Sequence, residues 1–190
     1  MSEVLFINAC ARPESRTLDL AQHLVGKIKG NLQRVDLYDI NILPLDIKGI
    51  EKRQKAAETG DFSDEEFNLA KQFVNADVIV IAAPYWDLMF PAVLRTYIEA
   101  ICVAGITFRY SEKGIPVGLC KAKQIYYVTT AGGFIGENNL GFNYVKILAQ
   151  QLFGIDKARC ISAEGLDINP DIVTEVLKKA KEKIDNIYEQ

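Results

Sequence analysis

Segments of apolar or alternating residues recur along this chain, and stretches with helical spacing separate them. Five segments predict β-strands: VLFINA (4–9), QRVDLYD (33–39), DVIVIAAP (77–84), KQIYYVTTA (123–131) and ARCISAEG (158–165). The third is apolar after its first residue, which is typical of a parallel strand covered on both faces. Because strands and helices alternate over the whole chain, the pattern predicts an α/β fold with a doubly wound sheet.

Capping residues and glycines set the expected helix boundaries. Helices are predicted over 17–30, over 64–75, from Pro91 to about Val103, over about 140–153 and from Asn169-Pro170 onward. Ser63 and Glu66 form a capping box for the second helix, and Gly154 ends the fourth.

Two segments lie outside this alternation. ITFRYSEKGIPVGL (106–119) predicts a hairpin that turns at Lys113-Gly114. Residues 40–62 form a long connection, in which IEKRQKAAETGD is either a solvated surface segment or the rim of a pocket in a partner subunit.

Composition narrows the function classes. A chain of 190 residues that is 49% hydrophobic fits one globular domain, residues 1–190, with a sizeable core. A net charge of -3 gives no reason to expect nucleic acid as a partner. The longest apolar run, 78–86, is shorter than the roughly 18 residues of a membrane span. No basic leader precedes the first strand, so the expected location is cytoplasmic.

The cysteines and the histidine exclude several kinds of site. Cys10, Cys102, Cys120 and Cys160 are widely spaced and form no C-x-x-C pair, so reduced thiols are expected. His23 is the only histidine and falls in a helical pattern. The sequence therefore predicts no metal site and no catalytic triad that requires histidine.

Three loops are the candidate binding elements. In a doubly wound sheet, ligands bind beyond the carboxyl ends of the strands, near the point where the strand order reverses. The loops after the first, third and fourth strands are CARPESRT, PYWDLMFP and TTAGGF. The first has neither G-x-G-x-x-G nor G-x-x-x-x-G-K-[ST], which argues against a dinucleotide bound in the Rossmann manner and against a P-loop nucleotide.

Each loop offers a different kind of contact. Ser15, Arg16 and Thr17 open a helix, where free amides and hydroxyls suit a phosphate and Arg12 and Arg16 add positive charge. The alternative is that Ser15 or Thr17 is only an N-cap. Tyr85 and Trp86 suit a flat ligand, but core packing or a partner chain would explain them equally well.

The glycine pair after the fourth strand completes the set. At residues 130–133 the backbone can approach a ligand closely, although an ordinary turn has the same composition. A phosphate cup, an aromatic wall and a glycine turn at neighbouring strand ends fit a mononucleotide with a large flat ring. FMN is the candidate that meets all three requirements.

The sequence resembles the family of FMN-dependent NADH-azoreductases and quinone reductases over nearly all of its length. The similarity is densest in DVIVIAAPYWDLMFPAVLRTYIEAICVAGITFRYSEKGIPVGL, and VTTAGG and AEGL match in order and spacing. The resemblance implies a flavodoxin-like fold, in which a five-stranded parallel sheet of order 2-1-3-4-5 carries helices on both faces. It also implies a homodimer with the site at the interface.

Site residues follow from the same resemblance. It places Cys10, Ser15, Arg16 and Thr17 around the ribityl phosphate, Tyr85, Trp86, Asp87 and Leu88 beside the isoalloxazine, and Thr130, Ala131, Gly132 and Gly133 at its pyrimidine edge. Tyr110 is similar to an aromatic residue that overhangs the substrate pocket. Three positions depart from the family: Cys10 stands where serine is frequent, Ala131 replaces an arginine of some members, and Asp87 replaces an asparagine.

The implied activity is two-electron, ping-pong hydride transfer from NADH or NADPH through FMN to a quinone or azo acceptor. The flavin carries the chemistry, so no catalytic side chain is expected. Two alternatives remain open at this point: a flavodoxin-type one-electron carrier, and a flavin-free interaction module that docks through residues 85–90.

Overall fold

The computed structural model describes residues 1–137 and 139–188. Its strands are β1 (Glu3–Asn8), β2 (Asn31–Asp36), β3 (Val78–Ala82), β4 (Phe108–Tyr110), β5 (Pro116–Gly118), β6 (Gln124–Thr130) and β7 (Lys157–Ala163). The helices are α1 (Arg16–Lys27), α2 (Ile47–Thr59), α3 (Asn68–Asn75), α4 (Ala92–Ile101), α5 (Leu140–Leu148) and α6 (Val173–Tyr188). Short helical turns are η1 (Glu65–Phe67), η2 (Ala149–Phe153) and η3 (Pro170–Ile172).

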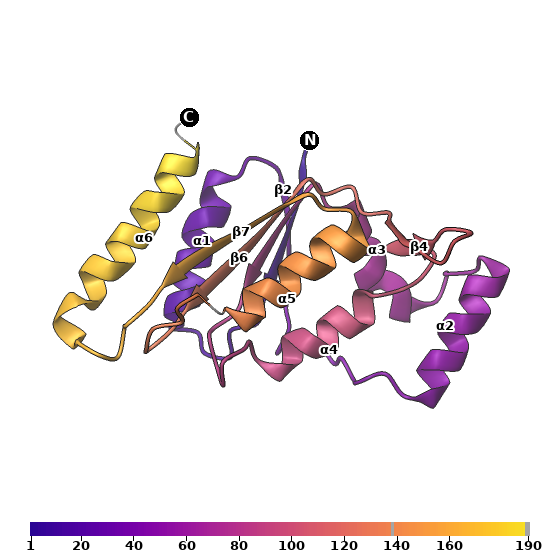
Figure 1. Cartoon of the computed structure of the whole chain (residues 1–190), viewed down its shortest axis with the longest axis horizontal. Coiled ribbons are helices and arrows are strands. Elements are labelled where there is room, and N and C mark those ends of the chain that lie inside the picture. Colours follow the sequence, from indigo (N-terminus) through magenta and orange to yellow (C-terminus); the bar gives the residue numbers. More distant parts are fainter. Residues whose placement is uncertain (138, 189–190) are drawn as a thin grey trace.

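The main sheet has the predicted topology. Its five strands are parallel and lie in the order β2-β1-β3-β6-β7, so β6 and β7 are the predicted fourth and fifth strands. The order reverses between β1 and β3, and all carboxyl ends lie at one edge of the sheet (Figure 1). The predicted flavodoxin-like fold is confirmed.

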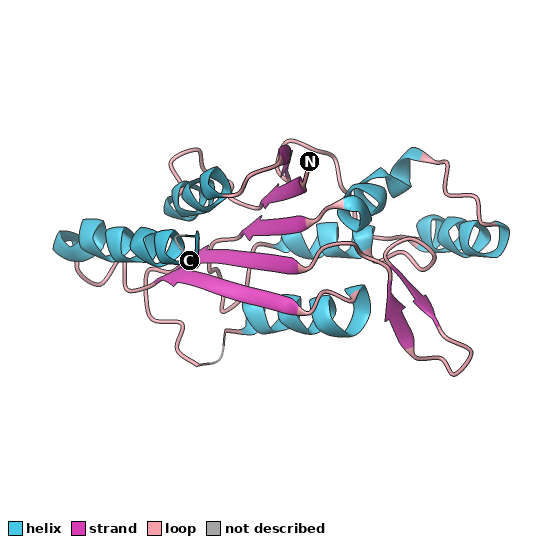
Figure 2. Ribbon diagram, turned by 90° about the horizontal axis from the view of Figure 1, so that it is seen from above, coloured by secondary structure: helices cyan, strands magenta, loops and turns pink. Residues whose placement is uncertain are grey.

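Helices cover both faces of the sheet, which explains the apolar strand sequences. Leu5 and Ile7 of β1 pack into a core with α3, α4 and α5, whereas Phe6 faces a second core formed with α1 and α6. The same alternation places Ile79 on the first face and Val80 on the second. Figure 1 shows α1 and α6 on one side of the sheet and α4 and α5 on the other, and Figure 2 shows the five strands side by side. Among the described helices, none is both long and apolar enough to cross a membrane.

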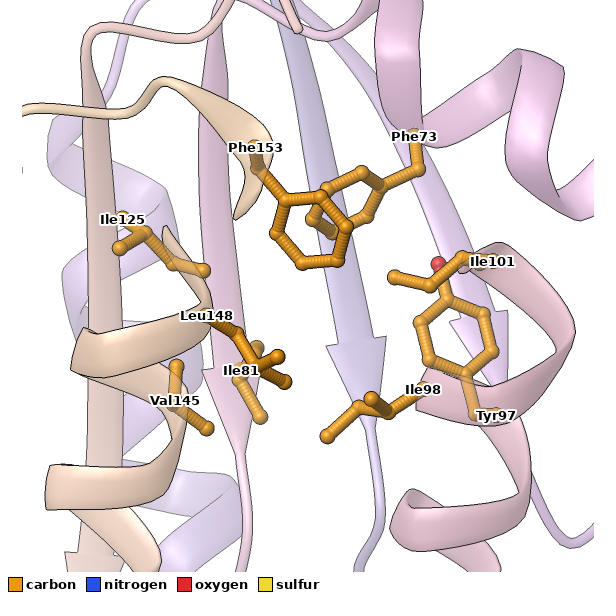
Figure 3. Close-up of a pocket in the computed structure, with 9 residues that line it drawn as sticks. All are labelled: Phe73, Ile81, Tyr97, Ile98, Ile101, Ile125, Val145, Leu148 and Phe153. Atoms are coloured by element: carbon orange, nitrogen blue, oxygen red, sulfur yellow. The ribbon is translucent and has the colours of Figure 1, made fainter. Parts of the chain in front are cut away.

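The first core contains a small cavity of about 10 Å³, lined by nine side chains (Figure 3). Tyr97 is one of them and is fully buried. Its hydroxyl has no hydrogen-bond partner within the described part of the chain. Burial without a partner is unfavourable for a hydroxyl, so Tyr97 is a weak point of this core.

The predicted hairpin is confirmed. β4 and β5 pair antiparallel as a separate two-stranded sheet, and Gly114 turns with a φ of 72°. The hairpin lies beyond the amino ends of the main strands, at the end of the molecule opposite to their carboxyl ends (Figures 1 and 2).

The connection at 40–62 contains a helix that the sequence did not predict. Asp46 caps α2 by accepting a hydrogen bond from the Gly49 amide at 2.8 Å, and Gly60 ends the helix with a φ of 74°. Ala56 is the only buried residue of α2. A helix that buries so little has no clear apolar stripe, so the periodicity could not show it.

The predicted capping box was wrong. The cap is Asp64, which accepts from the Glu66 amide at 3.0 Å and begins the turn η1; α3 starts only at Asn68. The Glu66 carboxylate pairs with Lys52 of α2 at 2.8 Å instead of reaching back to Ser63. The missed helix α2 therefore also accounts for the misplaced cap.

Candidate functional site

A cleft of about 370 Å³ lies at the carboxyl ends of β1, β3 and β6. It brings together eight of the residues that the sequence placed in the site: Ser15, Arg16, Thr17, Tyr85, Trp86, Thr130, Ala131 and Gly132. Arg12, Glu14, Pro84 and Asp167 complete its lining. The three predicted loops therefore converge on one cavity, and the loop after β7 adds a fourth wall.

The start of α1 provides anion-binding groups at one end of the cleft. Ser15 is the N-cap, and its hydroxyl accepts a hydrogen bond from the Leu18 amide at 3.3 Å. The first hydrogen bond of the helix runs from the Asp19 amide to the Ser15 carbonyl. The amides of Arg16 and Thr17 come before it and make no hydrogen bond within the described residues. Ser15 is thus an N-cap, as the alternative held, and two free amides remain beside it for an anion.

A pair of hydroxyls joins the first and third loops. Thr17 Oγ1 and Thr130 Oγ1 lie 2.6 Å apart, and both residues are buried. In such a pair one hydroxyl donates and the other accepts, so the acceptor keeps a hydrogen that it can donate to a third group. The pair can therefore fix the two loops and still offer one donor.

The aromatic wall stands on a strained turn. Trp86 and Met89 exchange two backbone hydrogen bonds of 3.0 and 2.8 Å, and the residues between them, Asp87 and Leu88, have φ values of 51° and 65°. This is the pattern of a type I′ turn, which normally takes Asn-Gly. Leu88 is 65% exposed and does not line the cleft, so contacts within the described chain do not offset its strained backbone.

Backbone bonds hold the glycine turn against the loop after β7. The amides of Gly165, Leu166 and Asp167 donate to the carbonyls of Gly133, Ala131 and Gly132, at 2.9, 3.1 and 3.0 Å respectively. Glu164 accepts from the Ile135 amide at 2.9 Å and from the Ser162 hydroxyl at 2.8 Å. These contacts fix the backbone of the turn, and the Gly132 and Gly133 amides make no hydrogen bond within the described residues.

Cys10 does not line this cleft, although the resemblance placed it beside the phosphate. It lines a neighbouring cavity of about 280 Å³ with Asn8 and Asp36, next to the end of β2. Burial raises the pKa of its thiol to about 11, so it stays protonated at neutral pH. Arg12 lines both cavities and forms the border between them.

Four other predicted residues also lie outside the lining of the cleft. Asp87 and Leu88 are exposed at the tip of the strained turn, and Gly133 lies just beyond Gly132. Tyr110 lies on the distant hairpin, 59% exposed, with its ring packed edge-on against Phe108 of the same strand (Figure 1). The chain does not bring its own Tyr110 to its own cleft.

A family model described as "Flavodoxin-like fold" matches residues 2–187. The chain belongs to the flavodoxin-like fold family. Similar proteins include enzymes named for an activity. FMN-dependent NADH:quinone oxidoreductase 2 of Clostridium acetobutylicum is 36% identical, and the match covers 96% of each chain. An FMN-dependent NADH:quinone oxidoreductase of Clostridium beijerinckii is 33% identical, again over 96% of each.

A solved structure of this flavodoxin-like type is similar over the full length. The azoreductase from Bacillus anthracis superposes with a TM-score of 0.85 at 27% sequence identity, and the match covers 99% of both chains. The two backbones match along the whole fold, so the elements that form the cleft have counterparts in an azoreductase.

Three of the lining residues were not predicted from the sequence. Pro84 precedes the predicted aromatic residues, and Glu14 lies inside the quoted first loop, so their positions alone were a signal for them. Asp167 comes from a loop that was not among the three candidates. The signal for this loop was weaker, because it follows a strand at the edge of the sheet, away from the point where the strand order reverses.

Proposed function

We propose that this chain is an FMN-dependent NAD(P)H oxidoreductase that reduces quinones and azo compounds by two-electron ping-pong transfer. In this proposal residues 1–190 form one FMN-binding domain. The strongest support is the cleft, which combines an anion-binding helix start with an aromatic wall at the switch point of the sheet. The names of the similar proteins, quinone oxidoreductases and an azoreductase, agree with this chemistry.

The donor groups in the cleft fit a phosphate ester at one end. The free amides of Arg16 and Thr17, the spare hydroxyl hydrogen of the Thr17–Thr130 pair, and the guanidinium of Arg12 can all donate to phosphate oxygens. A second cation, Arg16, is already paired with a carboxylate at 2.9 Å. The set is that of an anion site, as the terminal phosphate of FMN requires.

The other end of the cleft fits a flat ring. Tyr85 and Trp86 provide apolar area, and the amides of Gly132 and Gly133 are available to a polar ring edge. When bound, FMN would supply the redox chemistry by accepting a hydride from NAD(P)H and passing two electrons to the acceptor. The protein would orient the reactants and let one cleft serve nicotinamide and acceptor in turn, which is the origin of ping-pong kinetics.

The proposed homodimer explains residues that the single chain leaves without a role. Tyr110 lies far from its own cleft, so a substrate pocket that includes this side chain requires the hairpin of a partner. Trp86, Leu88 and Phe134 are 39%, 65% and 78% exposed around the cleft and would lose exposed apolar area in such a dimer.

Purification and an absorbance scan provide the first test. We expect a yellow protein with an FMN spectrum, NADH oxidation driven by benzoquinone or an azo dye, and parallel lines in double-reciprocal plots at several acceptor concentrations. Light scattering should give about twice the chain mass of 21.2 kDa. A colourless protein that cannot be reconstituted with FMN would refute the proposal. A yellow protein with a stable semiquinone and no NADH turnover would indicate the one-electron carrier instead.

A further inference from the structure

An ion pair spans the edge of the cleft between its first and fourth walls. Arg16 Nη1 lies 2.9 Å from Asp167 Oδ1, and it also donates to the Leu166 carbonyl at 3.4 Å. The pair joins the first residue of α1 to a loop 151 positions away in the sequence. Arg16 is therefore not a free cation for a ligand in this structure.

Backbone hydrogen bonds fix the main chain at Asp167 against the glycine turn. The Asp167 amide donates to the Gly132 carbonyl at 3.0 Å, and the neighbouring Leu166 amide donates to Ala131 at 3.1 Å. Gly132 has no Cβ, and a Cβ built at that position would collide with the Asp167 carboxylate. The carboxylate therefore lies beside the glycine turn at the lining of the cleft, and its side chain is 73% exposed.

This placement sets a balance of charge at the anion-binding end. The lining contains two arginines, Arg12 and Arg16, and two carboxylates, Glu14 and Asp167. A phosphate monoester carries about -1.5 to -2 charges near neutral pH. A phosphate held by Arg16 has to share that guanidinium with Asp167 and lies close to a like charge. An asparagine at 167 would accept the same hydrogen bond without the repulsion.

We propose that Asp167 is an internal competitor for Arg16 that lowers the affinity of the cleft for FMN. The inference rests on the proposed function, because it concerns the phosphate of the same cofactor. The competition acts only on the phosphate: a flavin without this group does not require Arg16. FMN therefore dissociates more readily than it would if Arg12 and Arg16 acted on its phosphate without Asp167.

The test compares FMN with riboflavin, which lacks the phosphate. With full-length protein and fluorescence titration, Asp167→Asn should tighten FMN binding roughly threefold to tenfold, the effect expected of one surface charge near a dianion. Riboflavin affinity should not change. Asp156→Asn is the matched control, because it makes the same change in charge just before β7, at the other end of that strand. It should leave both affinities unchanged.

A second pair of variants separates competition from positioning. In an Arg16→Gln background the gain from Asp167→Asn should fall well below its value in the wild-type background, because the shared guanidinium is gone. Weaker FMN binding by Asp167→Asn, or an equal gain for riboflavin, would overturn the inference while leaving the proposed function intact. Wild-type protein that binds neither flavin would overturn both.

Discussion

The buried hydroxyl pair between Thr17 and Thr130 allows the structural and binding roles of one residue to be separated. The two oxygens lie 2.6 Å apart, and Thr17 and Thr130 are 1% and 9% exposed. Thr17→Val replaces the hydroxyl with a methyl group of similar size. The variant therefore leaves Thr130 without its partner and creates almost no cavity.

The expected stability changes follow from the cost of an unpaired buried hydroxyl. Loss of one partner should lower the free energy of unfolding by about 1–2 kcal/mol, whereas replacing both partners with valine should be nearly neutral. Thr17→Val should thus be destabilised in urea, and the double variant Thr17→Val/Thr130→Val should recover most of the loss. Thr17→Ser keeps the hydroxyl and serves as the matched control.

FMN affinity should respond differently from stability. We expect Thr17, which adjoins the free amides of α1, to accept from Thr130 and to donate its own hydrogen to the phosphate. This donor is then absent from the single variant and from the double variant, and one donor to a charged group contributes about 1.5–3 kcal/mol. Both variants should therefore bind FMN roughly tenfold or more weakly, with riboflavin affinity nearly unchanged. Thr17 does not bind the phosphate if the double variant regains FMN affinity together with stability, or if Thr17→Val binds FMN as tightly as the wild type does.

Three further predictions concern stability. Tyr97→Phe removes the unpartnered buried hydroxyl and should raise the free energy of unfolding by about 1 kcal/mol; Tyr126→Phe, which loses a 2.9 Å bond to Tyr188, should lower it by a similar amount in the same urea titration. Leu88→Gly relieves the positive φ of 65° and should raise the free energy of unfolding of the isolated chain by about 1 kcal/mol. The thermal midpoint should rise with it, and a lower midpoint would contradict this. Burial raises the pKa of Cys120 from 9.0 to about 12, so the folded state retains this proton longer than the unfolded state does, and stability should fall as pH rises from about 9 towards 12. Cys120→Ala should flatten that decline in alkaline denaturation curves.

Most of the sheet could be predicted because its strands are covered on both faces. In β1 and β3 successive side chains enter different cores, so nearly every position must be apolar and the segments are conspicuous. α2 gave no comparable signal, because Ala56 is its only buried residue. The misplaced cap at Ser63 followed from the same gap, since Glu66 pairs with Lys52 of that helix.

The sequence predicted which loops form the candidate site, but not the direction in which each of their side chains points. Ser15, Thr17 and Trp86 line the cleft because their loops follow neighbouring parallel strands, which is a topological fact available from the sequence. Cys10 faces the adjacent cavity instead, because the side chain of a loop residue can point to either side of the backbone. Asp167 is fixed by backbone bonds to the glycine turn, a long-range contact with no local motif.

The turn at 86–89 shows why exposed apolar residues and strained backbone belong together in this molecule. An Asp-Leu pair in a type I′ turn is less stable than Asn-Gly, and local packing would not select it. Strain of this kind persists when surrounding contacts over-determine the conformation, and such contacts cluster at binding sites. Leu88 is 65% exposed, so the contacts that offset its strain have to come from outside the described chain. A ligand over the cleft or the face of a second subunit would supply them. Leu88→Gly should therefore stabilise the isolated chain while weakening FMN binding or dimer formation.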